Sequence, residues 1–548
     1  MLHCHPVRTE DRQGVAGLVR LAIDLGAERV GGPLSPEEKI LRDSHRQDPL
    51  PEGVDRDNAR NALARGDDPF AEPYLDGMPK ALRYRLGVVL TPHRIVKAML
   101  AEVAWASPRR VVDMGCGTGR FSGEAARQVP DAKIIAVDID PLGTLLTRAR
   151  LAALGHRNAR VVCGDYVDLA LDRIGGTTAF VGNPPYARHH ELSSDQKAKA
   201  AALARGLGFP LSGLSGLHAH FLFATAANSA PGDVGCVITS AEWMMVTYGE
   251  AVRNLLAGPL GLKALHLLDP AAMAFPETMT TAVILTFHSG GLHTSVSVTP
   301  HATPETLGRR NGKTWEIRRK DLTGTTWGHL LWKRRPIPKT RTAIPLRDLF
   351  RVHRGIATGD NSFFVMTAED AKERRLLPWM RPVLTRAKEV MDAKGNVRRG
   401  PQTKMILALS KTADLDDPDG DPLREYLAQG ELRGVPNRYL CAHRRPWWWL
   451  GDREPAPIVA TYMARRPPAF AQNPDRLLNL NVIHGLYPTK PLDDSLLHEV
   501  VKNLNAQRER LRGQGRVYQG GLEKFEPREL EAVRVAVGPR FARSAEAT

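Results

Sequence analysis

A glycine-rich turn between an apolar segment and a helix constrains the fold of this chain more than any other feature. Residues 110–114 (RVVDM) are typical of a buried strand, and three glycines follow them within residues 115–119. Glycine lets the backbone turn tightly and lets a ligand approach it closely. Between residues 87 and 290, seven predicted strands alternate with helices, which is the pattern of a doubly wound sheet. The expected fold class is therefore α/β.

The ends of the next two predicted strands carry carboxylates suited to a nucleoside. Residues 134–137 run into Asp138, roughly 20 residues after the glycines, where a carboxylate can hold a ribose diol. Residues 159–163 lead to Gly164 and Asp165, and Asp165 can accept a hydrogen bond from an adenine amino group. Because ligands of open α/β sheets bind beyond the carboxyl ends of the strands, we expect these groups to converge.

The fourth predicted strand, residues 178–182, ends in the tetrapeptide Asn183-Pro184-Pro185-Tyr186. The Asn side-chain oxygen and the carbonyl of Pro184 can both accept hydrogen bonds from one planar amino group. The second proline fixes φ in the turn, and the tyrosine offers a flat face for stacking. Two acceptors beside a stacking face form a site for an exocyclic amine such as N6 of adenine.

The order of these motifs resembles that of the Rossmann-like, S-adenosylmethionine-dependent N6-adenine DNA methyltransferases of the TaqI type. The resemblance implies a class I methyltransferase sheet, S-adenosylmethionine as methyl donor and no metal. It also implies that a site-specific enzyme flips an adenine out of double-stranded DNA. The cofactor residues that it implies are Thr91, Asp113, Gly115, Gly117, Gly119, Asp138, Asp165 and Asn183.

The same resemblance implies a set of catalytic residues around the flipped base. Asn183 and the Pro184 carbonyl would accept both N6 protons and help the nitrogen to pyramidalise as it attacks the methyl group. Phe275 stands where the family has an aromatic residue against the second face of the adenine, although an ordinary core aromatic is the alternative. The full set is Asn183, Pro184, Pro185, Tyr186 and Phe275.

The length of 548 residues is too great for a single core, so we expect several domains. We predict a helical N-terminal extension at 1–86, a catalytic domain at 87–306 and an α+β target recognition domain at 307–548. Residues 35–38 (SPEE) form a capping box that opens a helix of the extension. The extension is either a surface for DNA or a partner, or an appendage that only packs.

The charge pattern favours a polyanionic partner. The formal net charge is +16, and residues 309–347 hold twelve basic and two acidic residues. This run indicates a surface that follows DNA phosphates, although a solvated charged face is the alternative. Arg188, beside the catalytic loop, could contact phosphates or belong to an exposed loop. The candidate DNA-binding residues are Arg188, Arg318, Arg319, Lys333 and Arg334.

Three other functions are compatible with parts of this pattern. A methyltransferase for the glutamine of release factors uses the same tetrapeptide, but it does not need a basic C-terminal domain of over two hundred residues. An RNA adenine methyltransferase stays open, because only substrate competition excludes it. The intact motifs argue against a catalytically idle DNA-binding subunit of a defence complex.

The cellular setting follows from what the sequence does not contain. Its five cysteines form no Cys-x-x-Cys pair, and no signal peptide or apolar run of about 18 residues is present. We therefore expect a cytoplasmic protein, and we also expect a monomer. The resemblance to the DNA methyltransferases implies that it belongs to a restriction-modification or other defence or epigenetic system. A separate restriction endonuclease or defence-system subunits are its expected protein partners.

Overall fold

The computed structural model divides the chain into two compact units, Met1–Leu331 with Tyr518–Gly521, and Trp332–Val517 with Leu522–Thr548. The residues that it describes are 15–50, 55–268, 282–291, 293–303, 306–307, 314–322, 326–327, 343–415, 420–464, 466–511, 515–518 and 522–536. Among these residues, no helix is both long and apolar enough to cross a lipid bilayer.

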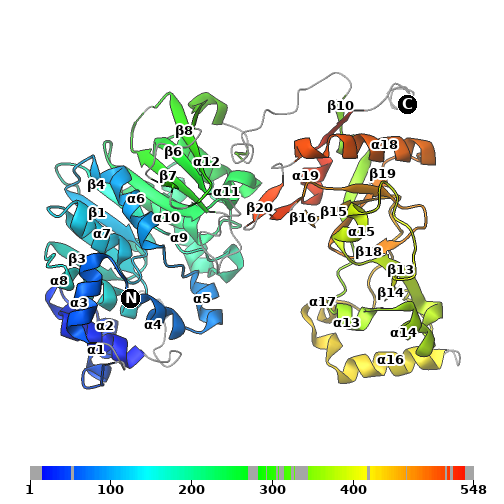
Figure 1. Cartoon of the computed structure of the whole chain (residues 1–548), viewed down its shortest axis with the longest axis horizontal. Helices are drawn as coiled ribbons and strands as arrows, with labels where there is room; N and C mark the ends of the chain where they lie inside the picture. Colours follow the sequence, from blue (N-terminus) through cyan, green and yellow to red (C-terminus); the bar gives the residue numbers. More distant parts are fainter. Residues whose placement is uncertain are drawn as a thin grey trace. The chain divides into compact units, whose positions relative to one another are not determined.

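The first unit is built on a nine-stranded sheet of order β3-β2-β1-β4-β5-β7-β6-β8-β9 (Figure 1). The strands from β3 to β5 are parallel, and β7 pairs antiparallel with both β5 and β6. The α/β class is thus confirmed, and the seven strands expected between residues 87 and 290 are β1 to β7. The nine strands are β1 (Arg110–Met114), β2 (Lys133–Asp138), β3 (Ala159–Cys163), β4 (Thr178–Gly182), β5 (Val234–Ser240), β6 (Leu262–Leu268), β7 (Ala282–His288), β8 (Ser295–His301) and β9 (Trp315–Arg318).

Helices cover both faces of this sheet, which explains why its central strands β1, β4 and β5 are buried along their whole length. Successive side chains alternate between the faces, so Val111 packs with α6 and α7 while Val112 packs with α10 and α12. The helices are α6 (His93–Ala104), α7 (Arg120–Gln128), α8 (Pro141–Ala153), α9 (Ser194–Gly206), α10 (Leu217–Asn228), α11 (Glu242–Met245) and α12 (Glu250–Ala257).

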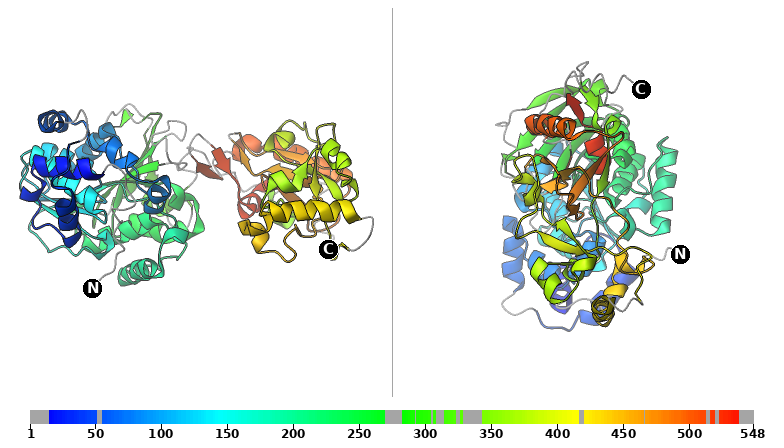
Figure 2. Two further views of the ribbon diagram at one scale, coloured as in Figure 1. Left: turned by 90° about the horizontal axis from the view of Figure 1, so that it is seen from below. Right: turned by 90° about the vertical axis from the view of Figure 1, so that its right-hand side faces the viewer.

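The N-terminal extension packs onto α8 and forms a core of its own with that helix. Figures 1 and 2 show these helices, in dark blue, gathered beside the first sheet. The predicted capping box is confirmed, because Ser35 Oγ accepts from Glu38 N and the Glu38 carboxylate accepts from Ser35 N. The helices are α1 (Val15–Leu25), α2 (Pro36–His45), α3 (Arg56–Arg65), α4 (Ala71–Asp76) and α5 (Lys80–Leu86).

The first unit continues past residue 306, where we placed the end of the catalytic domain. Strand β9 pairs antiparallel with β8, and the Trp327 ring is fully buried against Trp243 at a centroid distance of 5.4 Å. The sequence signal for this extra piece is weak because β9 is short and lies at the sheet edge. A cut at Thr306 would therefore remove part of the core.

The second unit combines small, mostly antiparallel sheets with short helices, including sheets of order β11-β19-β15-β17 and β12-β14-β13-β18. Its helices are α13 (Asn361–Phe364), α14 (Ala368–Glu373), α15 (Ala387–Met391), α16 (Asp421–Leu432), α17 (Tyr439–Ala442), α18 (Asp494–Ala506) and α19 (Pro527–Glu531). Its strands are β10 (Ala343–Pro345), β11 (Phe350–Arg354), β12 (Val365–Met366), β13 (Met380–Leu384), β14 (Lys404–Leu407), β15 (Ile458–Thr461), β16 (Met463–Ala464), β17 (Phe470–Gln472), β18 (Leu478–Asn479), β19 (Ile483–Pro488), β20 (Arg516–Tyr518), β21 (Leu522–Lys524) and β22 (Arg534–Ala536).

Candidate active site

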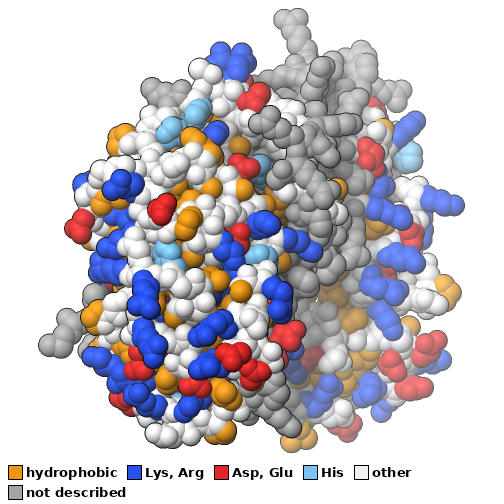
Figure 3. Space-filling view, turned by 60° about the vertical axis from the view of Figure 1, so that its left-hand side comes forward, with side chains coloured by type: hydrophobic (Ala, Val, Ile, Leu, Met, Phe, Trp, Pro, Cys, Tyr) orange, Lys and Arg blue, Asp and Glu red, His pale blue; other side chains and the backbone are white. Residues whose placement is uncertain are grey.

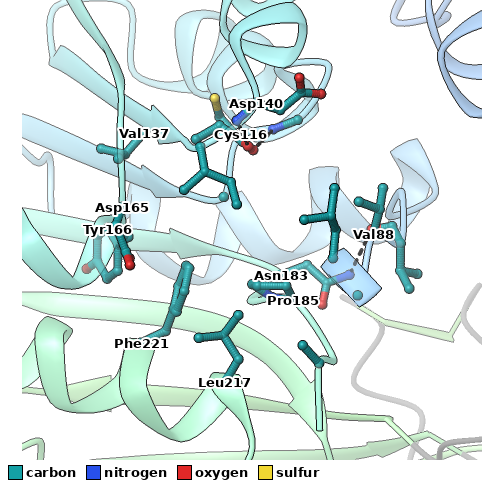
Figure 4. A pocket seen from close by; sticks show the side chains of 18 of the residues that line it. Val88, Cys116, Val137, Asp140, Asp165, Tyr166, Asn183, Pro185, Leu217 and Phe221 are labelled. Atoms are coloured by element: carbon teal, nitrogen blue, oxygen red, sulfur yellow. Dashed lines mark hydrogen bonds between the residues drawn. The ribbon is translucent and has the colours of Figure 1, made fainter. Parts of the chain in front are cut away.

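A cavity of about 1270 Å³ lies at the carboxyl ends of the parallel strands of the first unit (Figure 4). The glycine loop, the strand ends at Asp138 and Asp165, and the tetrapeptide all contribute to its wall, as does the segment that precedes α6. The sequence-predicted residues that line it are Thr91, Gly115, Gly117, Asp138, Asp165, Asn183 and Pro185. The topology of the sheet has thus brought together residues that are up to 94 positions apart in the chain.

The glycine loop is held in place by Asp138. Asp138 Oδ2 accepts a hydrogen bond of 2.8 Å from Gly117 N, and Oδ1 accepts one of 2.9 Å from Asp140 N. Gly117 has a φ of +50°, in the left-handed region that disfavours a side chain. The carboxylate therefore fixes the loop and also presents an acceptor edge to the cavity.

Asp113 and Gly119 support this loop from behind, and neither lines the cavity as we expected of a cofactor contact. Asp113 Oδ2 accepts from both the backbone nitrogen and the hydroxyl of Ser122, in the first turn of α7, and burial raises the pKa of Asp113 to about 7. A Cβ atom on Gly119 would lie 2.9 Å from Thr147 Cα, so only glycine lets α7 approach α8 so closely. Both residues are structural.

The amide of Asn183 is oriented by two neighbours from the segment before α6. Its Nδ2 donates to the carbonyl of Val89 at 3.3 Å and to the hydroxyl of Thr91 at 3.1 Å (Figure 4). Because a carbonyl can only accept, the nitrogen must face Val89 and the oxygen must face the other way. Asn183 Oδ1 is buried and has no hydrogen-bond partner among the described residues. Leaving a buried acceptor unpaired costs about 1–3 kcal/mol, which indicates an acceptor kept for a ligand.

The other residues of the tetrapeptide differ in their contacts and in whether they line the cavity. Tyr186 N donates to the carbonyl of Gly87 at 3.2 Å, and the tyrosine hydroxyl is buried without a partner in the described part of the chain. Burial raises the pKa of Tyr186. Pro184 is buried, and neither Pro184 nor Tyr186 lines the cavity. Phe275 lies outside the described residues.

Phe221 and Ile139 are among the apolar side chains of the cavity that were not predicted from the sequence. Phe221, on α10, stacks on Tyr166 with a centroid distance of 5.0 Å and an interplanar angle of 28° (Figure 4). Ile139, directly after Asp138, is 40% exposed although it is apolar. Helix α10 is buried along most of its length, so its sequence does not distinguish Phe221 from core residues. The sequence signal that could have identified Ile139 is its position, as an apolar residue directly after the acidic residue at the end of a predicted strand.

The candidate DNA-binding residues differ in their exposure and in the partners of their side chains. Arg188 is exposed, and exposed Arg318 pairs with Asp321 at 2.9 Å. Arg319 is instead a structural residue, because its guanidinium donates to the carbonyls of four residues, His293, Ala257, Leu262 and Gly291. Lys333 and Arg334 lie outside the described residues. Figure 3 shows Lys and Arg side chains scattered among fewer acidic ones over one face.

Comparison with known proteins agrees with this geometry. Residues 111–202 match the family described as "Methyltransferase domain", and residues 335–547 match "Type II methyltransferase M.Eco57I, C-terminal domain". Type II methyltransferase M.XamI of Xanthomonas campestris pv. amaranthicola is 40% identical over 465 residues, which cover 82% of this chain and 85% of that protein. Type II methyltransferase M.AccI of Acinetobacter calcoaceticus is 23% identical over 469 residues, with the same coverage.

The solved structure of the type IIL restriction-modification enzyme MmeI in complex with DNA is similar in fold. It aligns with a TM-score of 0.56 and 13% identity over 94% of this chain and 79% of its own. The sheet order, the glycine loop and the cavity define a class I methyltransferase fold, with S-adenosylmethionine as the methyl donor. The chain belongs to the type II methyltransferases, the DNA-modifying enzymes of restriction-modification systems.

Replacing Asp138 by alanine is expected to raise the Kd for S-adenosylmethionine about tenfold or more. The change removes the carboxylate that fixes Gly117 and with it charge-assisted hydrogen bonds worth about 1.5–3 kcal/mol each. Calorimetry measures this effect. Asp131→Ala is the matched control, because Asp131 is exposed just before β2, at the end of that strand far from the cavity. Equal affinities for the two variants would place the cofactor elsewhere.

Proposed function

We propose that the methyl acceptor is N6 of an adenine in double-stranded DNA. The observation that carries this proposal is the buried, unpaired Oδ1 of Asn183, whose orientation is fixed by Val89 and Thr91. An amino group that enters the cavity meets this acceptor beside the rigid Pro-Pro turn. Asparagine at the head of the tetrapeptide also favours adenine, because cytosine-N4 enzymes more often carry serine there.

The residues of the cavity fit S-adenosylmethionine by their chemistry. The glycine loop gives a close backbone approach, Asp138 offers acceptor positions for ribose hydroxyls and Asp165 offers them for an adenine amino group. Asp165 Oδ1 accepts from Val167 N, which holds the carboxylate at the end of β3. Ile139 and Phe221 supply apolar surface for a purine ring. The bound cofactor supplies a methyl group already activated by its positive sulfur.

The protein's part in the reaction is to position and polarise the amine. The N6 lone pair is delocalised into the purine ring, so the nitrogen is a poor nucleophile until it pyramidalises. Hydrogen bonds from its two protons to Asn183 Oδ1 and the Pro184 carbonyl favour that geometry. During methyl transfer these acceptors would stabilise the positive charge on the nitrogen, and the N6 proton that the nitrogen then loses would pass to water.

We further propose that the second unit selects the target sequence. Its residues make up most of the match to the M.Eco57I C-terminal domain family, which covers 335–547. The proposed domains are therefore the extension to residue 86, the catalytic domain after it and the recognition domain from about residue 332. A monomer that acts beside a separate restriction endonuclease is the corresponding assembly.

The base assignment is tested by digesting methylated DNA to nucleosides and separating them by mass spectrometry. We expect N6-methyladenine as the single new nucleoside after incubation with S-adenosylmethionine. Duplex RNA of the same sequence, offered in competition, should remain unmodified. N4-methylcytosine in place of N6-methyladenine would contradict the proposal.

A further inference from the structure

A buried carboxylate of the N-terminal extension connects that extension to the active site. Asp68 lies between α3 and α4, and its side chain is 8% exposed. It accepts hydrogen bonds of 2.9 Å from Thr118 Oγ1 and 2.6 Å from Arg120 Nε, and it also pairs with Arg150 at 2.5 Å. These three donors belong to the glycine loop, the start of α7 and the inner face of α8.

One of these donors continues the connection to the catalytic tetrapeptide. Arg120 Nη1 donates to the Thr91 carbonyl at 2.7 Å, and the Thr91 hydroxyl accepts from Asn183 Nδ2. Arg150 Nε donates to the carbonyl of Thr118 at 2.8 Å, which secures the loop a second time. Asp68 therefore contacts the glycine loop directly. A series of hydrogen bonds through Arg120 and Thr91 connects it to Asn183.

We propose that Asp68 is a positioning residue, which holds the glycine loop for the cofactor and, through Arg120 and Thr91, the amide of Asn183 for the methyl acceptor. The extension is then a working part of the active site. Tyr74 of the same extension supports this view, since it lines the cavity and its hydroxyl donates to Asp140 at 2.6 Å. The part that concerns Asn183 rests on the proposed function, whereas the part that concerns the loop does not.

The charges explain why this position needs a carboxylate. Arg150 is almost fully buried, and Arg120 is 17% exposed, so without Asp68 two cations would lack their shared counter-ion. Burial alone would raise the pKa of Asp68, but the charges of Arg150 and Arg120 outweigh burial and keep it below the usual value. Asparagine at this position keeps the size of the side chain and removes the charge.

The chain offers a matched control in Glu38. This residue of α2 forms an ion pair with Arg148 of α8 that is even more buried than the ion pairs of Asp68, with side-chain exposures of 0% and 1%. Arg148 otherwise donates to the carbonyls of Val30, Gly32, Pro33 and Val161. None of these residues lines the cavity. Glu38→Gln therefore weakens the packing of the N-terminal extension on α8, as Asp68→Asn does, but it removes no contact with the glycine loop.

The experiment compares full-length Asp68→Asn and Glu38→Gln with the wild-type protein. Tm is measured by thermal unfolding, the Kd for S-adenosylmethionine by calorimetry, and the single-turnover methylation rate at saturating cofactor and DNA. We expect both variants to lower Tm. Only Asp68→Asn should raise the Kd tenfold or more and lower the single-turnover rate tenfold or more.

The proposal would be overturned if Asp68→Asn kept the wild-type Kd and the wild-type rate. It would also be overturned if Glu38→Gln lost as much cofactor affinity and rate as Asp68→Asn, or if Arg120→Gln kept the wild-type rate. Arg120→Gln tests the arm from Asp68 to Thr91 should Asp68→Asn not fold, and it should lower the rate at saturating cofactor. The calorimetric result does not depend on which base is methylated. A wild-type protein that methylates cytosine would therefore refute the proposed function and leave the test of the loop intact.

Discussion

Replacing Asn183 by alanine is expected to lower the methyl-transfer rate about 1000-fold while the affinity for S-adenosylmethionine stays nearly unchanged. The substitution removes the buried oxygen that is free to accept from the target amine. It leaves Asp138 and Asp165 at the cofactor end of the cavity in place. Single-turnover kinetics with saturating DNA measures the rate, and calorimetry measures the affinity.

Asn228→Ala is a suitable control for this variant. The Asn228 amide also bridges backbone groups of the first unit, since Nδ2 donates to the carbonyls of Leu169 and Ala224 and Oδ1 accepts from Leu171 N. It lies on α10 but does not line the cavity. Its loss should lower Tm and spare the rate. If Asn183→Ala kept full activity, the catalytic role of this residue would be refuted.

A fragment that ends at Leu331 should still bind S-adenosylmethionine and should lose sequence-specific DNA binding. Its DNA affinity should fall to the non-specific level, about 1000-fold or more below that of the intact protein for its target. The cut lies at the boundary between the two units, and it keeps β9 and the buried Trp327 that a cut at Thr306 would remove. Fluorescence anisotropy with target and scrambled duplexes measures the difference.

Thermal unfolding must first show that the fragment is folded. The slope of log affinity against log salt should become shallower by about 0.9 for each DNA phosphate that only the second unit neutralises. A folded fragment that methylates the same site with the same preference would show that recognition lies in the first unit. The assignment of recognition to the second unit would then be wrong.

Sequence patterns predicted the elements of the active site better than the roles of single residues. Apolar strands followed by glycine, aspartate or asparagine predict that these residues meet at one sheet edge, because parallel strands end together. Whether a polar residue at a strand end faces a ligand or the protein depends on which neighbour it meets. Asp113 faces Ser122 in α7, and nothing in the local sequence distinguishes it from Asp138 in this respect.

The contribution of the N-terminal extension could not be predicted for a different reason. Asp68 pairs with residues 50 to 82 positions further along the chain, and pairs of this kind leave no periodic signal. The same holds for Arg319, whose position in a basic run suggested a phosphate contact. In the folded chain its guanidinium satisfies backbone carbonyls from three separate segments.

The central claim, site-specific methylation of adenine N6, is tested most directly by modification-sensitive sequencing of a host genome. Cells that express the wild-type chain are compared with cells that express Asn183→Ala. We expect N6-methyladenine at one position of one short sequence throughout the wild-type genome, and no such modification with the variant. Methylated cytosine, or methylation without a common sequence, would contradict the claim.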